Sequence, residues 1–162
     1  MASFEACVTI NSTGVAVFEF LARPVNLPHI TPPEAGLQLV RCPERFAHGS
    51  RFEFQMTGFG PAQHFLHEIV AFDEPRGFTE RQMKGPLRKF VHEHVVEPAG
   101  DGSVVVIDRV EFEPPGGLLR FVVSEERILK SLKNALEYRH RELKARLQQP
   151  PSAAGHPRSK ES

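Results

Sequence analysis

The chain has 162 residues, of which 40% are apolar and 25% are charged, and its 20 basic residues balance its 20 acidic ones. This length suits one domain with its own core, and zero net charge gives no electrostatic support for binding nucleic acid or an anionic membrane surface. No apolar run approaches the roughly 20 residues that a bilayer span needs, and the N-terminus lacks the basic start and apolar stretch of a signal peptide.

The N-terminal part of the chain predicts a strand followed by short helical segments. Residues 3–10 (SFEACVTI) have strand composition. The polar run at 11–13 offers capping side chains for a short apolar helix, which Pro24 ends or offsets. The segment 24–33 is then either a second short helical turn or an irregular linker.

Strand-like segments separated by Gly and Pro turns fill the middle of the chain. The segment 50–56 alternates cleanly, with Phe52, Phe54 and Met56 on one face and polar or charged side chains on the other. The predicted strands are 36–42, 50–56, 63–72, 77–83, 89–97 and 103–113.

The chain changes character after the Pro-Pro-Gly-Gly run at 114–117. Residues 118–147 contain no Pro or Gly, and Leu and Val recur at helical spacing among charged residues. The pattern predicts one amphipathic helix of about 30 residues, some 45 Å long at the standard rise. An antiparallel sheet must cover its apolar face, so we expect an α+β fold in which a curved sheet wraps around this helix. The short helices would close the remaining gap and leave a cavity.

Four stretches carry a family resemblance: LPHITPPEAGL (27–37), FTERQMKGPLRKFVHEHVVE (78–97), DRVEFEPPGG (108–117) and ALEYRHREL (135–143). The chain resembles the START-like, birch-pollen-allergen superfamily (SRPBCC), and within it a bacterial branch described as ligand-binding or cyclase/dehydrase-like. The resemblance implies a helix-grip fold. Superfamily relatives bind lipids, sterols or polyketides and some are cyclases, and the fold alone does not choose among these functions.

The resemblance and the composition together divide the chain. We expect a START-like ligand-binding domain at 1–147. The remainder, 148–162, is rich in Pro, Ser, Gly and charge. Such a segment cannot bury enough apolar surface to offset its ordering entropy, so we expect a disordered tail.

Alternation along the strands indicates which side chains face the helix. The last strand carries charges at Glu111 and Glu113, which places Asp108 on the opposite, inner face. Glu93 marks the outer face of the strand 89–97 in the same way. The expected inner face has an apolar lining of Phe52, Phe54, Met56, Phe65, Ile69, Phe78 and Phe90 and polar positions at His67, Glu80, Gln82, His92, His94 and Asp108.

The turns between strands determine which polar residues meet. A turn symmetric about Gly100 sets His92 opposite Asp108, whereas a slip of one residue would turn the whole strand over. The preceding turn, near residue 85, brings Glu80 or Gln82 alongside His92.

Apolar walls with a few polar groups have the form of a small-molecule site. A histidine between two carboxylates has its charged form favoured and could donate to a ligand carbonyl or phenol. The same histidine could act as a general acid or base. A third possibility is that these polar side chains form a buried hydrogen-bond network with no further function. Leu132 and Leu136 of the long helix join the predicted lining. Arg139 reaches a ligand carboxylate or, as we favour, pairs with an acidic side chain of the sheet or the helix.

A metal site is the less favoured interpretation of the same residues. His92 and His94 form an H-x-H pair that Asp108 or Glu80 could complete to two histidines and one carboxylate. The motif is a weak signal, because same-face histidines arise easily and no C-x-x-C or H-E-x-x-H accompanies it. We therefore expect neither a metal nor a cofactor.

Three functions are consistent with the sequence. The first is a carrier or sensor that encloses a small hydrophobic ligand, and the second is a cyclase/dehydrase-type enzyme that uses His92 and Asp108. The third is an interaction domain whose interior is filled by its own side chains. Cys7 and Cys42 form no disulfide framework and no spaced metal motif. We expect them to be buried free thiols in a cytoplasmic protein.

Overall fold

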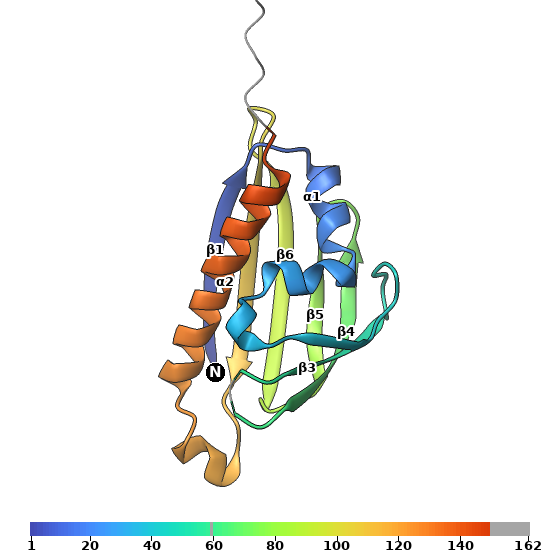
Figure 1. The fold of residues 1–162 in the computed structure, drawn as a ribbon. Coiled ribbons are helices and arrows are strands. Elements are labelled where there is room, and N and C mark those ends of the chain that lie inside the picture. Colours follow the sequence, from blue (N-terminus) through green and yellow to red (C-terminus); the bar gives the residue numbers. More distant parts are fainter. Residues whose placement is uncertain (59, 150–162) are drawn as a thin grey trace, which may run out of the picture.

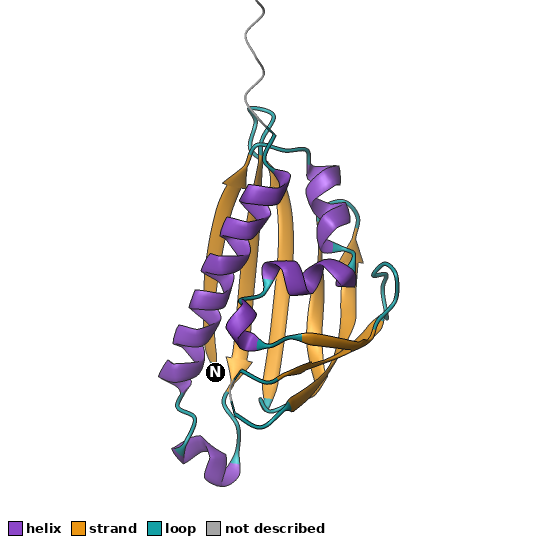
Figure 2. Ribbon diagram, viewed as in Figure 1, coloured by secondary structure: helices purple, strands orange, loops and turns teal. Residues whose placement is uncertain are grey.

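The computed structural model describes residues 1–58 and 60–149, so all but the first two residues of the expected tail (148–162) lie outside the described residues. Seven strands form one antiparallel sheet in the order β1-β7-β6-β5-β4-β3-β2, which curves around the C-terminal helix (Figure 1). The helices α1, η1 and α2 all lie over the same face of the sheet (Figure 2). The strands are β1 (Ala2–Ile10), β2 (Gln38–Arg41), β3 (Arg51–Met56), β4 (Gln63–Asp73), β5 (Gly77–Lys84), β6 (Lys89–Pro98) and β7 (Val104–Glu113). The predicted α+β helix-grip architecture is confirmed.

Short helices follow β1, as predicted. Helix α1 (Gly14–Leu21) begins where the side chain of Thr13 accepts a hydrogen bond from the backbone N–H of Ala16, which satisfies one of the free donors of the first turn. The 3₁₀ helices η1 (Pro24–Ile30) and η2 (Pro33–Ala35) come next. Proline opens each of them, since its fixed φ suits the first helical position.

The C-terminal helix is shorter than the sequence predicted. A separate 3₁₀ helix, η3 (Gly117–Phe121), precedes it, and α2 spans Glu125–Leu147. The helix is shorter because a capping signal at Ser124 lies within the predicted helix. Ser124 has an extended backbone and its side chain accepts from the N–H of Arg127, while two glutamates occupy the first turn, where negative charge is favourable.

The predicted strand faces are confirmed. On β7, Val104, Val106, Asp108, Val110 and Phe112 are all buried, and the residues between them are half-buried or exposed. Strands β3 and β6 bury alternate residues in the same way over most of their length. Because only one face of the curved sheet is covered, every second residue along these strands is buried.

The register of the last hairpin differs from the prediction. His94 pairs with Asp108 and His92 with Val110, so the turn is centred one residue later than Gly100. The side chain of Asp101 accepts a hydrogen bond from the N–H of Ser103, an Asx turn that fixes this centre. The resulting shift is two residues, so every side chain keeps its predicted face. In the preceding hairpin His92 lies opposite Glu80, one of the two predicted partners.

A polar layer divides the apolar core into two clusters. Val106 and Val110 of β7 belong to different clusters, and Asp108 lies between them in the strand. Helix α2 is divided in the same way between Leu136 and Leu143. The sheet and the helix therefore meet through apolar contacts at both ends and through polar contacts in the middle.

The expectation of buried thiols was wrong, because Cys7 and Cys42 are both exposed. Cys7 lies on β1 opposite Ile107, a residue of the outer face of β7, so the alternation that turns its half-buried neighbours Ala6 and Val8 inward turns its own side chain outward.

Removal of a packed ring tests the assignment of the inner face. Phe54 is 5% exposed and stacks on Phe65 with ring centroids 4.8 Å apart. Phe54→Ala should therefore lower the free energy of unfolding by about 3–5 kcal/mol in urea denaturation. The control Phe121→Ala removes a ring that is 75% exposed and should change it by no more than about 0.5 kcal/mol. Equal effects of the two substitutions would contradict the assignment.

Candidate functional site

Seven ionisable side chains meet in the polar layer between sheet and helix. Their positions on neighbouring strands and on one face of α2 follow from the inner-face alternation described above. They are His67 on β4, Glu80 on β5, His92 and His94 on β6, Asp108 on β7, and Arg139 and His140 on α2, all of them buried.

Asp108 is the centre of the layer and is fully buried. Its Oδ1 lies 2.7 Å from Nε2 of His92 and 3.0 Å from Nδ1 of His94, and its Oδ2 lies 2.6 Å from Nε2 of His140. Burial by itself would raise the pKa of Asp108, but the charge of Arg139 and the three imidazole hydrogen bonds hold the pKa well below its ordinary value. Asp108 is therefore a carboxylate that receives hydrogen bonds from both β6 and α2.

Glu80 forms a second carboxylate centre toward β4. Its Oε2 accepts from Nδ1 of His67 at 2.8 Å, and its Oε1 lies 3.2 Å from Nε2 of His94 and 3.4 Å from Nδ1 of His92. Burial opposes ionisation here too, but the hydrogen bonds from the three histidines lower the pKa of Glu80 well below its ordinary value.

The pKa values of the two histidines of β6 are shifted in opposite directions, although both side chains lie between the carboxylates. Burial acts to lower the pKa of His92, yet its hydrogen bonds to Asp108 and Glu80 raise the pKa above the ordinary value. Burial, followed by the charges of His92 and Arg139, lowers the pKa of His94. With Nδ1 unprotonated, His94 accepts from Arg139 over 2.9 Å and donates from Nε2 to Glu80. With Nδ1 protonated, His94 donates to Asp108 instead.

The buried carboxylates have buried cationic partners. Glu80 and Asp108 both contact His92, whose protonated form is favoured by these two contacts, and Asp108 also lies beside the guanidinium of Arg139. A buried charge is costly unless it is paired and hydrogen-bonded, so these pairs explain how several ionised groups share one interior site. Two buried nitrogens still have no hydrogen-bond partner among the described residues, Nε2 of His67 and Nε of Arg139.

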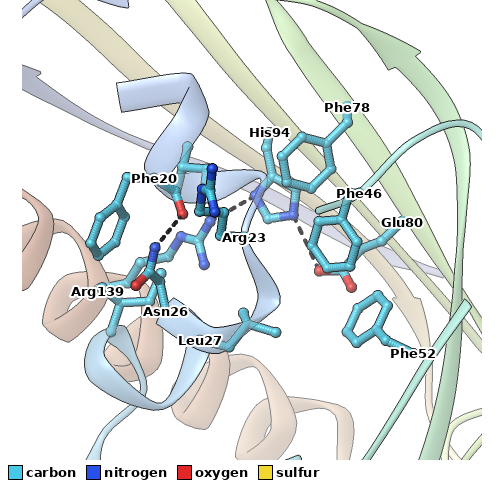
Figure 3. A pocket seen from close by; sticks show the side chains of 12 residues that line it. Phe20, Arg23, Asn26, Leu27, Phe46, Phe52, Phe78, Glu80, His94 and Arg139 are labelled. Atoms are coloured by element: carbon cyan, nitrogen blue, oxygen red, sulfur yellow. Dashed lines mark hydrogen bonds and ion pairs between the residues drawn. The ribbon is translucent and has the colours of Figure 1, made fainter. Parts of the chain in front are cut away.

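A small opening beneath η1 leads to this layer. Phenylalanine and aliphatic side chains form its walls, and Glu80, His94 and Arg139 face it from the layer (Figure 3). The cavity volume is about 10 Å³, which is room for about one water molecule. The cavity that the sequence predicted between sheet and helix is therefore filled largely by side chains. The lining residues are Phe20, Leu21, Arg23, Asn26, Leu27, Ile30, Phe46, Phe52, Phe78, Glu80, His94 and Arg139.

A larger hollow of about 320 Å³ lies at the other end of the sheet, between the start of α1 and the β6–β7 turn. Arg76 is the one ionisable residue in its lining, and it is exposed. This hollow lacks the convergent buried polar groups of a specific site, so the opening beneath η1 is the better candidate.

The structure brings together only some of the predicted site residues at the opening. His92 and Asp108 lie behind His94 in the layer and do not line it. The amide of Gln82 donates to the backbone oxygen of Leu87 and stays out of the cluster. Arg139 lines the opening and also lies 3.5 Å from the Asp108 carboxylate. The remaining predicted residues pack in the two apolar clusters: Phe54, Met56, Phe65 and Ile69 in the first, Phe90, Leu132 and Leu136 in the second.

Sequence reasoning missed His140 and the walls supplied by η1. His140 lies four residues after Leu136 and three before Leu143, so helical spacing places it on the buried stripe and could have identified it. The η1 residues Asn26 and Leu27 carried no such signal, because a short segment with two prolines has no periodicity to read.

Solved structures of distant proteins share this fold. Major latex-like protein 151 of Panax ginseng is 23% identical, with a TM-score of 0.67 over 90% of this chain and 97% of that chain. The Zhui aromatase/cyclase of a Streptomyces species is 13% identical, with a TM-score of 0.73 over 90% and 92%. A protein of Thermus thermophilus is 17% identical, with a TM-score of 0.66 over 90% and 96%. The chain thus shares its helix-grip fold with these proteins.

The family follows from the sequence itself. A family model described as polyketide cyclase/dehydrase and lipid transport matches residues 1–148, and the chain belongs to this family. No match was found among curated proteins. Among the described residues, no helix combines the length and the apolar character that crossing a bilayer requires.

Replacement of the central carboxylate should be costly and pH-dependent. Asp108→Asn should lower the free energy of unfolding at pH 7 by about 3–5 kcal/mol, because Arg139 and His92 lose their buried counter-charge. Folding lowers the pKa of Asp108, so its stabilising effect is present above the ordinary carboxyl pKa, about 3.9, and is lost as the pH falls below it. In urea denaturation, the difference in free energy of unfolding between wild type and variant should become smaller as the pH falls from about 5 to about 3.

The control for this experiment is Glu93→Gln on the same strand as His92. Glu93 is paired with Arg109 in an exposed salt bridge, so its loss should cost no more than about 0.5 kcal/mol at either pH. An Asp108→Asn effect as small as the control, or one that is independent of pH, would show that the Asp108 carboxylate is not ionised in the fold.

Proposed function

We propose that the protein binds one small, largely apolar molecule in the opening beneath η1, with a polar group of that molecule directed at Glu80, His94 and Arg139. One observation carries the proposal: an opening with aromatic and aliphatic walls ends at three buried ionisable side chains. Apolar walls supply affinity for a ligand, and a few convergent polar groups fix its orientation. The family description, which includes lipid transport, is consistent with this function.

The unpartnered donor of Arg139 supports the same orientation. Its Nε has no hydrogen-bond partner and lies 3.5 Å from Asp108 without the geometry of a hydrogen bond. A buried donor without an acceptor costs free energy. A ligand oxygen that accepts from this nitrogen would remove that cost, so we infer a carbonyl, hydroxyl or carboxylate group at the inner end of the ligand.

A ligand larger than water requires the wall to move, and η1 is the part of the wall that can. Its side-chain hydrogen bonds are local: Asn26 donates to the backbone oxygen of Phe20, and Thr31 donates to that of Leu27. Among the described residues, no hydrogen bond joins η1 to a strand. Displacement of η1 would therefore open the pocket without breaking the sheet.

A bulky side chain in the opening should block binding. Leu27→Trp should weaken the binding of a fluorescent hydrophobic dye by at least about tenfold, because the indole occupies space that the ligand needs. Val25→Trp is the matched control, since Val25 lies on the same 3₁₀ helix but is 61% exposed. Fluorescence titration measures the affinity, and circular dichroism confirms that both variants fold.

Native mass spectrometry of freshly purified protein complements the dye. A stoichiometric co-purified small molecule that is absent from Leu27→Trp supports the proposal. A wild-type protein that carries no molecule and binds no dye would contradict it and would favour an interaction domain with a filled interior.

General acid–base catalysis is a second candidate, favoured by the opposite pKa shifts of two neighbouring histidines. The pKa of His92 is raised and that of His94 is lowered. Neighbouring groups whose pKa values are shifted in opposite directions are typical of acid–base sites. The sequence placed His92 and Asp108 at the centre of such chemistry. Because His94 and Glu80 line the opening instead, they would touch the substrate, while His92 and Asp108 would position them.

The catalytic candidate has its own test. His94→Gln should abolish turnover of a polyketide-like substrate in a cyclisation or dehydration assay while dye affinity stays within about threefold of wild type. Turnover that survives in His94→Gln, or that is absent from wild type, would leave ligand binding as the function.

A further inference from the structure

We propose that Glu80, His92 and His94 form a binding site for one divalent first-row transition-metal ion such as Zn²⁺ or Fe²⁺. Among the described residues, these three side chains offer ligand atoms that all lie within 4.8 Å of one another, and all three are buried. The proposal does not depend on the binding of an apolar ligand, and it reverses the expectation drawn from the H-x-H motif alone.

The spacing of the ligand atoms suits a metal ion. Oε1 of Glu80 lies 3.2 Å from Nε2 of His94 and 3.4 Å from Nδ1 of His92. Ligand atoms bound tetrahedrally at about 2.0–2.1 Å lie about 3.3–3.4 Å from each other. The two distances from the carboxylate are thus already those of a coordinated set, and the pairing of Glu80 with His92 across β5 and β6 maintains them.

An independent observation is the support behind the two histidines. Asp108 lies on the side away from Glu80, and its Oδ1 contacts the other ring nitrogen of each histidine, Nε2 of His92 at 2.7 Å and Nδ1 of His94 at 3.0 Å. Metal-binding histidines almost always donate their second ring N–H to such a group, which fixes ring orientation and tautomer. A carboxylate that is fully buried and shared by both rings is the arrangement that a metal site needs.

The third ligand is held in place as well. Nδ1 of His67 lies 2.8 Å from Oε2 of Glu80, so the carboxylate is anchored through one oxygen and presents the other to the histidines. In this arrangement each of the three ligands has a buried hydrogen-bonding partner on its far side, which matches the supporting shell of known metal sites.

Metal binding requires Nδ1 of His92 to release its proton to solvent, because a ligating imidazole nitrogen is unprotonated, and it requires one rearrangement around His94. For Nε2 of His94 to face the metal, Nδ1 must carry the proton and donate it to Asp108. Arg139, which donates to Nδ1 over 2.9 Å, then releases this nitrogen and stays paired with the Asp108 carboxylate, from which its Nε is 3.5 Å away. The movement is small because both acceptors lie within reach of the same guanidinium.

The ligand set and its position select the kind of ion. Two imidazoles and one carboxylate suit zinc and iron, whereas magnesium and calcium prefer oxygen ligands. Glu80 and His94 both line the opening beneath η1, so a coordination position not taken by the protein faces the opening, as at metal sites that keep one position for an exchangeable ligand.

Calorimetric titration of the chelator-treated full chain with Zn²⁺ tests the proposal. Wild type should bind one ion, and Glu80→Gln and His94→Gln should each weaken binding at least about 100-fold by removing a ligand. Asp108→Asn keeps every ligand and should weaken binding about 10–100-fold. The controls His29→Gln and His64→Gln remove exposed histidines and should leave affinity and stoichiometry unchanged.

A measurement on wild type keeps the test decisive if a core variant fails to fold. Zn²⁺ should shift the imidazole NMR signals of His92 and His94 and leave those of His29 and His64 in place, and it should raise Tm. The proposal is overturned if wild type binds no Zn²⁺, if the ion shifts only the exposed histidines, or if folded Glu80→Gln binds as tightly as wild type. Because the probe is the metal alone, none of these outcomes bears on the binding of an apolar ligand.

Discussion

The hydrogen bonding of the buried carboxylate of Asp108 is the constraint on which the rest of the interior depends. The group is fully buried and receives contacts from two histidines of β6 and from Arg139 and His140 of α2. A carboxylate in an apolar interior is stable only with such partners. The partners fix how α2 lies on the sheet, because a rotation of the helix would separate its polar pair from the carboxylate and leave a buried charge unpaired.

Stability alone does not explain this layer. Breaking a buried ion pair costs about 3–5 kcal/mol, but replacing the whole set by apolar residues of similar volume is often neutral or stabilising. The two apolar clusters on either side of the layer show that the same sheet and helix also pack without polar groups. The layer lies where the opening beneath η1 reaches the interior, the position at which we propose that polar groups contact a ligand or a metal. This position supports the proposal that the residues of the layer have a role beyond stabilising the fold.

Much of this could be predicted from the sequence because strand alternation is a local signal. Parity alone placed Asp108, His92 and His94 on the inner face, and the two-residue error in the strand register preserved that result. The start of α2 was misplaced because the capping side chain of Ser124 is a weaker signal than the surrounding leucine pattern. The walls from η1 could not be predicted, since they depend on how a 3₁₀ segment without periodicity docks on the sheet. Pocket volume also depends on side-chain packing, which alternation does not describe.

The most direct test of the account is a map of contacts between a bound apolar dye and the protein by intermolecular NOE measurements. If the dye binds in the opening beneath η1, NOEs should connect its protons to the rings of Phe46 and Phe78, which line the opening. The competing apolar surface is η3, where Leu118 and Phe121 are 84% and 75% exposed. NOEs to Phe46 and Phe78 would support a binding site that ends at the polar layer, and NOEs confined to Leu118 and Phe121 would contradict it.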